Sequence, residues 1–161
     1  MSNEIKTNVM RLLEKAGVKY EARYYEPNPR QPGSRIAEAL GEDQSRVFKT
    51  LVTVGKSGAH YAFLIPVVAE LDLKKAAKAS GEKSIEMIPE KELLPLTGYV
   101  HGGCSPIGMK KRMKHFIDVS VRDGDTMFMS GGKVGCQVGL KVEDAIKVAE
   151  LTLADLVKEA E

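Results

Sequence analysis

Two stretches of the sequence carry groups that could bind and polarise an oxygen atom of a ligand. The longer one, GYVHGGCSPIG at residues 98–108, holds four glycines, a histidine, a cysteine and a Ser-Pro step. Consecutive glycines let the backbone approach a ligand closely, and their N–H groups can form a nest for an anionic or carbonyl oxygen. The stretch matches neither GxxxxGKS/T nor GxGxxG, the two common phosphate-binding patterns. Taken alone, it is equally compatible with a tight turn.

The second stretch is an apolar run with a lysine inside it. Lys49 stands between Val47 and Leu51, which should face the same way as the lysine if the run is a strand. Two interpretations stay open at this point. The lysine either extends to solvent from the edge of a sheet, or is a cation held in a pocket. In a pocket, partial desolvation would strengthen its attraction for a carbonyl oxygen, a phosphate or a developing oxyanion.

Two reactive-looking side chains lie within the glycine-rich stretch, Cys104 and His101. Their spacing does not establish a thiol nucleophile, because the fold and not sequence adjacency brings nucleophile and base together. An unactivated cysteine is mostly a small buried hydrophobe. Ser105 precedes Pro106, which favours an extended backbone there. Its hydroxyl could therefore face a site or stabilise a turn.

A second glycine pair and a basic run lie further along the chain. Residues 131–132 are a Gly-Gly pair after a strand-like segment, suited to a hairpin turn or to the opposite wall of a pocket. The basic run contains Lys110, Lys111, Arg112 and Lys114. These cations could contact a phosphate backbone or form a solvated surface, and the net charge of +2 is too small to decide between the two.

Composition limits the class of protein. The 161 residues, 43% hydrophobic and 29% charged, predict a single soluble domain over residues 1–161. No apolar run is long enough to span a bilayer, and the N-terminus lacks the pattern of a signal peptide, so we expect a cytoplasmic protein. The two cysteines and three histidines are not spaced as a metal site, and we expect neither a metal nor a disulfide.

Hydrophobic periodicity predicts helices and strands mixed along the chain, an α+β fold. The first predicted helix covers residues 3–16, with Ser2 or Asn3 as N-cap, and the second is a short segment that is capped by Ser34 and ends near 40–41. A third helix covers 73–80, between Asp72 and Gly81, and a short one starts at Pro89. The last two predicted helices cover 143–149 and 153–160. The predicted strands cover 18–25, a hairpin of 47–54 with 61–67, and a meander of 116–121, 126–129 and 133–140. The proline-rich residues 26–33 predict an extended loop.

Four segments together resemble the YbaK/EbsC family, free-standing relatives of the editing domain of bacterial prolyl-tRNA synthetase. The segments are FKTL at 48–51, ELDLKKAA at 70–77, GYVHGGCSPIG at 98–108 and SGGK at 130–133. The resemblance runs from about residue 3 to 150. It implies a mixed, partly barrel-like β-sheet surrounded by helices. It also implies an aminoacyl-tRNA deacylase that acts in trans on cysteine attached to proline tRNA, with no metal or cofactor.

The family pattern assigns roles to individual residues. Lys49 matches the essential lysine, and the basic run would contact the acceptor stem. For a cysteinyl ester, the resemblance implies that the substrate's own thiol attacks the carbonyl and leaves as a cyclic thioester. His101 occupies a variable position of the motif, and its role stays open. Gln137 is a departure from the pattern that could alter the pocket wall and hence the amino acid accepted. The substrate-binding positions implied are Tyr25, Thr50, Gly102, Gly103, Ser105, Pro106, Ser130 and Gly131.

Alternatives to cysteine deacylation remain at this stage. Related domains remove alanine or other small amino acids. The fold could also serve as a catalytically silent module that binds tRNA or a synthetase, and prolyl-tRNA synthetase is a possible partner. A third alternative is an enzyme that uses the thiol of Cys104.

Overall fold

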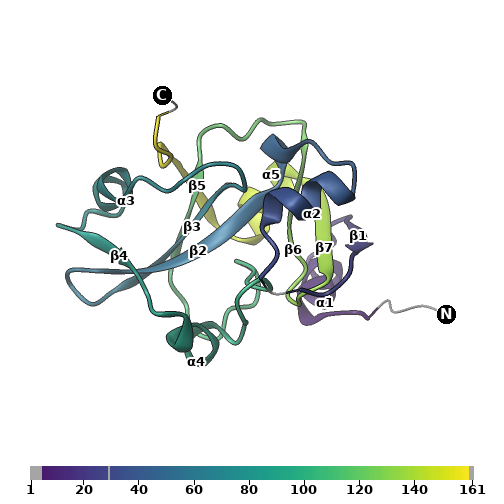
Figure 1. Cartoon of the computed structure of the whole chain (residues 1–161), viewed down its shortest axis with the longest axis horizontal. Helices are drawn as coiled ribbons and strands as arrows, with labels where there is room; N and C mark the ends of the chain where they lie inside the picture. The colour runs from purple at the N-terminus through teal and green to yellow at the C-terminus, as the bar shows by residue number, and fades with distance from the viewer. Residues whose placement is uncertain (1–4, 29, 160–161) are drawn as a thin grey trace.

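The computed structural model describes residues 5–28 and 30–159 and confirms an α+β fold (Figure 1). The strands form two sheets, one of three and one of five strands. The helices surround them, as expected. No helix in the described ranges is long and apolar enough to cross a membrane.

The five-stranded sheet has the order β4-β2-β3-β5-β8. Strands β2 (Phe48–Gly55) and β3 (His60–Pro66) form the predicted antiparallel hairpin, with Lys49 opposite Ile65. Strand β4 (Ile85–Met87), which the sequence did not predict, pairs only with the last residues of β2. The first half of β2, including Lys49, therefore lies on an open edge of the sheet.

The three-stranded sheet has the order β1-β7-β6 and is antiparallel throughout. It consists of β1 (Glu21–Tyr24), β7 (Cys136–Lys141) and β6 (Thr126–Ser130). Gln137 of the central strand lies opposite Ser130 on one side and Arg23 on the other. Directly opposed residues share a face of a sheet, so these three side chains lie on one face.

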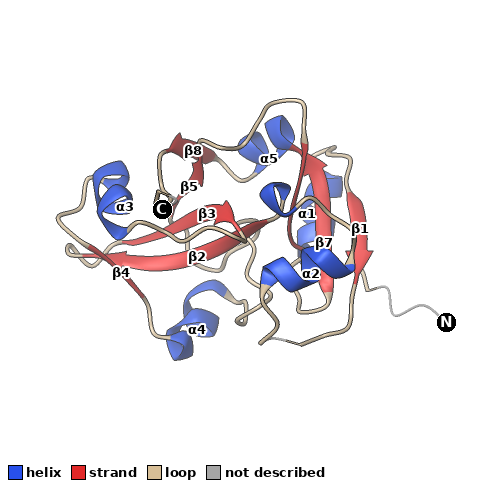
Figure 2. Cartoon of the chain, turned by 45° about the horizontal axis from the view of Figure 1, so that its top comes forward, coloured by secondary structure: helices blue, strands red, loops and turns tan. Residues whose placement is uncertain are grey.

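Two helices pack on opposite faces of the three-stranded sheet (Figure 2). Helix α1 (Asn8–Lys15) buries Val9 and Leu13 in a core with Met129 and Val138. Helix α2 (Gly33–Ala39) packs Ala37 against Phe128, whose side chain alternates to the other face. An isolated bridge between Val47 and Phe128 brings the start of β2 beside β6. The polar face of β7 thus meets the open edge of β2.

The helix boundaries differ from the predictions at two N-termini. Helix α1 begins at Asn8, and the Thr7 hydroxyl accepts a hydrogen bond from the Met10 N–H at 3.3 Å. The predicted caps Ser2 and Asn3 lie outside the described residues. Helix α2 begins at Gly33 after Pro32, with no side-chain cap, so the prediction of a Ser34 cap is wrong. Pro32 occupies the N-cap position with an extended backbone, at φ −61° and ψ 144°.

The remaining helices lie close to their predicted positions. Helix α3 (Leu73–Ser80) is capped by the Asp72 carboxylate and ends at Gly81 in the left-handed conformation, as predicted. A 3-10 turn (Glu90–Glu92) and helix α4 (Leu93–Thr97) follow Pro89. Helix α5 (Val142–Val148) follows β7 directly.

The predicted meander is wrong in its first strand. Strand β5 (Lys114–Asp118) pairs in parallel with β3 and with β8 (Leu151–Ala154), and only β6 and β7 form a hairpin. Phe116 and Ile117 of β5 are buried in different cores, on opposite faces of the strand. Burial on both faces is the pattern of an inner strand covered on both sides.

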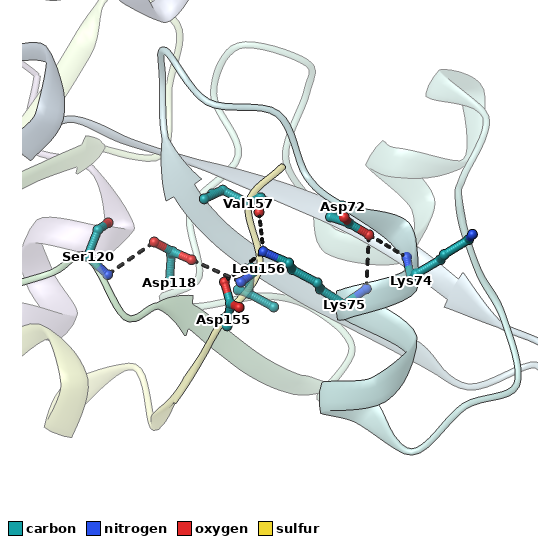
Figure 3. A network of polar contacts seen from close by, with 8 residues as sticks. All are labelled: Asp72, Lys74, Lys75, Asp118, Ser120, Asp155, Leu156 and Val157. Carbon is teal, nitrogen blue, oxygen red and sulfur yellow. Dashed lines mark hydrogen bonds and ion pairs between the residues drawn. The ribbon is translucent and has the colours of Figure 1, made fainter. Parts of the chain in front are cut away.

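The predicted helix over 153–160 is also wrong. The chain continues from β8 as an extended segment that is held against the rest of the molecule by hydrogen bonds (Figure 3). The buried Asp118 carboxylate accepts hydrogen bonds from the Leu156 N–H at 2.9 Å and the Ser120 N–H at 3.0 Å. The Lys75 ammonium donates to the Val157 carbonyl at 2.8 Å. The contacts to Leu156 and Val157 are long-range and satisfy backbone groups that a helix would have paired locally, and so favour the extended form.

Candidate active site

A cavity of about 190 Å³ opens where the edge of β2 meets the polar face of the three-stranded sheet. The loop 98–108 and the segment leading into α2 complete its wall. It contains five of the residues expected at a site: Tyr25, Lys49, Thr50, Gly102 and Ser130. Residues that the sequence placed more than fifty positions apart therefore line one cavity.

Lys49 supplies a positive charge to this cavity. Its side chain is half-buried, and that burial lowers the pKa of the ammonium, while the Glu70 carboxylate opposes the shift. Within the described chain, the ammonium makes no hydrogen bond and no ion pair. Both interpretations offered by the sequence hold in part, because the lysine leaves an open sheet edge and also lines a pocket. An unpaired, partly desolvated cation is suited to bind an oxygen of a ligand.

Two oxygen atoms in the cavity wall also have no partner. Thr50 Oγ1 and Gln137 Oε1 are both buried, and among the described residues neither has a hydrogen-bond partner. Gln137 is only 4% exposed. Leaving a buried polar atom unpaired costs about 1–3 kcal/mol. These atoms are therefore a liability to the fold unless a ligand or water pairs with them.

The glycine-rich loop reaches the cavity through Gly102, which has a φ of +86° that only glycine adopts readily. Gly103 does not line the cavity. A Cβ on Gly103 would lie 3.1 Å from the Val134 nitrogen, so its small size lets the loop pack against the segment after β6. Its N–H donates to the Val100 carbonyl at 2.9 Å and is not available to a ligand.

Three further expected residues lie behind the cavity wall and do not line it. Ser105 is fully buried, and its hydroxyl accepts a hydrogen bond from the Ile107 N–H at 3.1 Å. It stabilises the turn that includes Pro106, and Tyr99 donates to the Ile107 carbonyl of the same turn. A Cβ on Gly131 would lie 2.5 Å from Cys136 Sγ, so this glycine is required by packing. For these residues, a direct contact with substrate stays a prediction.

Ser130 and Tyr25 lie on the three-stranded-sheet side of the cavity. The Ser130 hydroxyl accepts a hydrogen bond from the Gly132 N–H at 3.0 Å, which fixes the hydroxyl at the end of β6. Burial raises the pKa of Tyr25, so its phenol is protonated at neutral pH and can donate a hydrogen bond.

Cys104 and His101 also line the cavity. Burial raises the pKa of Cys104 to about 12, although a hydrogen bond with Thr97 opposes this shift. Because the thiolate and not the thiol is the nucleophile, Cys104 is poorly suited to attack an ester at neutral pH. His101 is exposed and lies at the mouth of the cavity.

Some lining residues were not expected from the sequence. Gln31 and Ile36 come from the proline-rich loop and α2, and Leu93 comes from α4. The sequence identified the loop 26–33 only as extended, and nothing in its pattern indicated that it covers a site. The contribution of Gln137 depends on the register of β7, which fixes the face on which it lies.

The basic run lies outside the cavity, between the glycine-rich loop and β5. Lys110, Lys111, Arg112 and Lys114 are all exposed. Lys111 Nζ lies 3.5 Å from His60 Nδ1, and Arg112 lies 3.4 Å from a Glu150 carboxylate oxygen. In the described ranges, no three His, Cys, Asp or Glu residues are grouped so that they could hold a metal ion.

Comparisons with known proteins agree with this arrangement. Residues 30–148 match the family model described as an aminoacyl-tRNA editing domain. EbsC of Enterococcus faecalis, named as a candidate Cys-tRNA(Pro)/Cys-tRNA(Cys) deacylase, is 40% identical over 152 residues, which cover 94% of this chain and 93% of EbsC. The uncharacterised YwhH of Bacillus subtilis is 30% identical over 98 residues, 61% of this chain and 62% of YwhH.

A solved structure has the same fold. It is described as a candidate trans-editing enzyme for prolyl-tRNA synthetase, and it superimposes with a TM-score of 0.79 at 24% identity, covering 95% of this chain and 99% of that one. The matched family model covers most of the chain, and the E. faecalis relative aligns along nearly its whole length. The chain therefore belongs to the aminoacyl-tRNA editing domain family.

Proposed function

We propose that the protein is a trans-acting deacylase that removes cysteine from mischarged proline tRNA. The observation that carries the proposal is the Lys49 ammonium, which has no partner in the described chain and faces a small cavity with two unpaired oxygens. Membership of the editing domain family and the name of the E. faecalis relative support it. We expect the protein to act in the cytoplasm, where tRNAs are charged.

An aminoacyl ester is already activated, so the site has only to orient its carbonyl and stabilise the charge that develops on oxygen. Lys49 would bind the carbonyl oxygen, and the backbone at Gly102 would lie against the ester. The thiol of the cysteinyl group attacks its own carbonyl carbon and forms a C–S bond. The C–O bond to the ribose breaks, and the thiol proton goes to the ribose oxygen. The products are free tRNA and a cyclic thioester, which water opens to cysteine.

The cavity is large enough for a small amino acid. Its volume is about 190 Å³. A cysteinyl group has six non-hydrogen atoms and would fit in it. An alanyl group would also fit, so size does not separate cysteine from alanine. The reacting thiol would separate them, because alanine has none.

The exposed basic run would contact the acceptor stem through phosphates. Such contacts depend on salt and not on nucleotide sequence. Discrimination among tRNAs would then need a partner, for which prolyl-tRNA synthetase is the candidate. We expect the isolated protein to hydrolyse cysteinyl esters of different tRNAs at similar rates.

A deacylation panel tests the proposal. Proline tRNA carrying cysteine, alanine or proline is incubated with the wild-type protein, with Lys49→Ala, and with Lys56→Ala as the matched control. Lys56 is an exposed lysine in the turn that follows β2. We expect selective release of cysteine by the wild type and by Lys56→Ala, and none by Lys49→Ala.

Two other results would replace the proposal. Faster release of alanine would make the protein an alanine deacylase and would exclude the thiol-assisted mechanism. Binding of tRNA without hydrolysis of any ester would make it a silent binding module. Full activity in Lys49→Ala would remove Lys49 from the mechanism.

A further inference from the structure

Unpaired polar atoms are concentrated at the cavity. Among the described residues, four buried side-chain atoms have no hydrogen-bond partner, and two of them, Thr50 Oγ1 and Gln137 Oε1, belong to residues that line it. They come from different sheets, β2 and β7. The other two belong to residues that do not line the cavity.

A matched residue shows that this chain can satisfy a buried threonine. Thr53 lies three positions after Thr50 in the same strand and is fully buried. Its hydroxyl donates to the Tyr61 carbonyl at 3.0 Å. The hydroxyl of Thr50 has no such partner, although its strand neighbour Leu64 lies directly opposite. Both residues are threonines of the same strand, so the residue type does not explain why only the Thr50 hydroxyl is unpaired. Of the two, only Thr50 lines the cavity.

A single hydrogen-bond donor would be a suitable partner for both atoms. Amide and hydroxyl oxygens accept hydrogen bonds, and rotation of the Gln137 carboxamide about its last side-chain bond can turn Oε1 toward the cavity. An aminoacyl ester has two kinds of donor near its carbonyl, the α-amino group and the ribose hydroxyl. The ribose lies beyond the ester oxygen, on the side of the tRNA. The α-amino group is therefore the donor that enters with the acyl carbon.

We propose that Gln137 and Thr50 form the subsite for the α-amino group of the aminoacyl ester. This inference rests on the proposed deacylase function. With the carbonyl oxygen on Lys49, the α-amino group is one carbon away, and Thr50 and Gln137 line the same cavity as Lys49. Among the described residues no carboxylate lines the cavity, so these neutral oxygens supply the acceptors.

The subsite defines the class of substrate. The protein accepts aminoacyl-tRNA with a free α-amino group and spares tRNA whose α-amino group is acylated, such as peptidyl- or formylaminoacyl-tRNA. An acylated nitrogen keeps only one N–H, carries no charge and has a bulky substituent. Deacylation is thereby confined to tRNA whose amino acid has not yet been joined to a peptide.

The test compares proline tRNA carrying cysteine with the same tRNA carrying N-acetylcysteine. Acetylation leaves the thiol and the ester intact. The variants are Thr50→Val and Gln137→Met, which remove the acceptors, Gln137→Glu, which keeps one, and Thr53→Val as the control. We expect the wild type to prefer the free amine. Thr50→Val and Gln137→Met each lose about tenfold in kcat/KM on the free-amine substrate, and neither changes on the acetylated one.

Gln137→Glu and Thr53→Val keep the preference for the free amine. Thermal unfolding provides a second measurement. Thr50→Val does not lower Tm, because it removes an unpaired buried hydroxyl, whereas Thr53→Val lowers Tm by breaking a hydrogen bond.

Several results would overturn the inference. They are equal losses on both substrates, no loss with either acceptor removed, and a wild type that does not distinguish the two substrates. In each of these cases the wild type still hydrolyses cysteinyl-tRNA, and the deacylase function stands. If the wild type hydrolyses neither substrate, the proposed function falls, and the subsite falls with it.

Discussion

Two buried polar regions of this molecule, the Asp118 network and the cavity at Lys49, differ in how their hydrogen bonds are completed. Asp118 is 2% exposed, and each of its carboxylate oxygens accepts a hydrogen bond from a backbone N–H of the same chain (Figure 3). In the cavity, the Lys49 ammonium, Thr50 Oγ1 and Gln137 Oε1 have no partner among the described residues. The first region holds the chain together, and the second is available to a ligand.

Buried polar groups that are paired within the chain and those that are not should contribute differently to stability and to activity. A buried polar group that is satisfied by its own chain stabilises the fold, and removing one partner leaves another group unpaired. A buried polar group without a partner destabilises the free protein, and it is retained where a bound ligand completes it. Substitutions in the two regions should therefore have opposite signatures, in which activity and stability change separately.

The largest effect is expected for Lys49→Met, which removes the charge and keeps most of the aliphatic stem. Removing one group that stabilises a developing oxyanion typically costs about 10²–10³ in rate. Stability should not fall, because the desolvated ammonium has no partner to lose. Deacylation of cysteinyl-tRNA and thermal unfolding are measured on the same preparation. A lower Tm together with the lost activity would mean that Lys49 belongs to the structure as well as to the site.

The second effect should appear at Asp118. Replacing it with alanine leaves the Leu156 and Ser120 N–H groups without their acceptor, and we expect a loss of about 3 kcal/mol in the free energy of unfolding. Urea denaturation measures the loss, with the exposed Asp123→Ala as the control. Under conditions in which the variant is folded, deacylation should equal that of the wild type. A selective loss of activity in folded Asp118→Ala would break the comparison between the two regions.

Elements that depend on local sequence signals could be predicted from the sequence, and those that depend on long-range contacts could not. Examples of the first are α3, between its Asp72 cap and Gly81, and the β2–β3 hairpin around its glycine-containing turn. The C-terminal segment was predicted as a helix because its apolar residues have helical spacing. Its extended form depends on pairing with β5 and on Asp118, which lies 38 residues before Leu156 in the sequence. Long-range contacts of this kind override local propensity.

For the site, the resemblance identified Lys49, Thr50 and Ser130, and the structure places them around one cavity. It grouped Gly103 and Ser105 with them, although these residues support the loop from behind its surface. A motif records which residues a family keeps, but not whether each touches ligand or neighbouring backbone. The unpaired state of Gln137 follows from what surrounds it in three dimensions, and one sequence does not contain that information.

A smaller effect concerns His115, whose Nε2 is buried without a partner but does not line the cavity. Burial lowers its pKa, and a backbone hydrogen bond with Met113 opposes the shift. Above the unfolded-state pKa of about 6.5, both states are neutral and stability is unaffected. As pH falls below that value, the unfolded state binds the proton more readily, and stability decreases until the lower folded-state pKa is passed.

Replacing His115 with leucine should remove this acid sensitivity and leave deacylation unchanged. Urea denaturation at pH 7.5 and pH 5.5 measures the change for the wild type and for His115→Leu. We expect the wild type to lose less stability than Asp118→Ala does, and His115→Leu to lose less between the two pH values than the wild type. Some loss remains in the variant because burial also lowers the pKa of His60. If His115→Leu loses deacylase activity at pH 7.5, an unpaired buried group outside the cavity also contributes to catalysis. Lining the cavity would then no longer distinguish the groups needed for activity from the others.

The smallest effect is expected for Cys104→Ser, although Cys104 lines the cavity. Burial raises its pKa to about 12, so a thiolate is scarce at neutral pH, and the substrate's own thiol would act as the nucleophile. Deacylation by Cys104→Ser should remain within a few-fold of the wild-type rate, and the wild type should resist iodoacetamide at pH 7. A loss as large as that of Lys49→Met would transfer the nucleophile from the substrate to the protein. In that case alanyl-tRNA should also be hydrolysed, because the reaction would no longer need a thiol on the amino acid. The cysteine variant and the alanine substrate therefore test the same step from opposite sides.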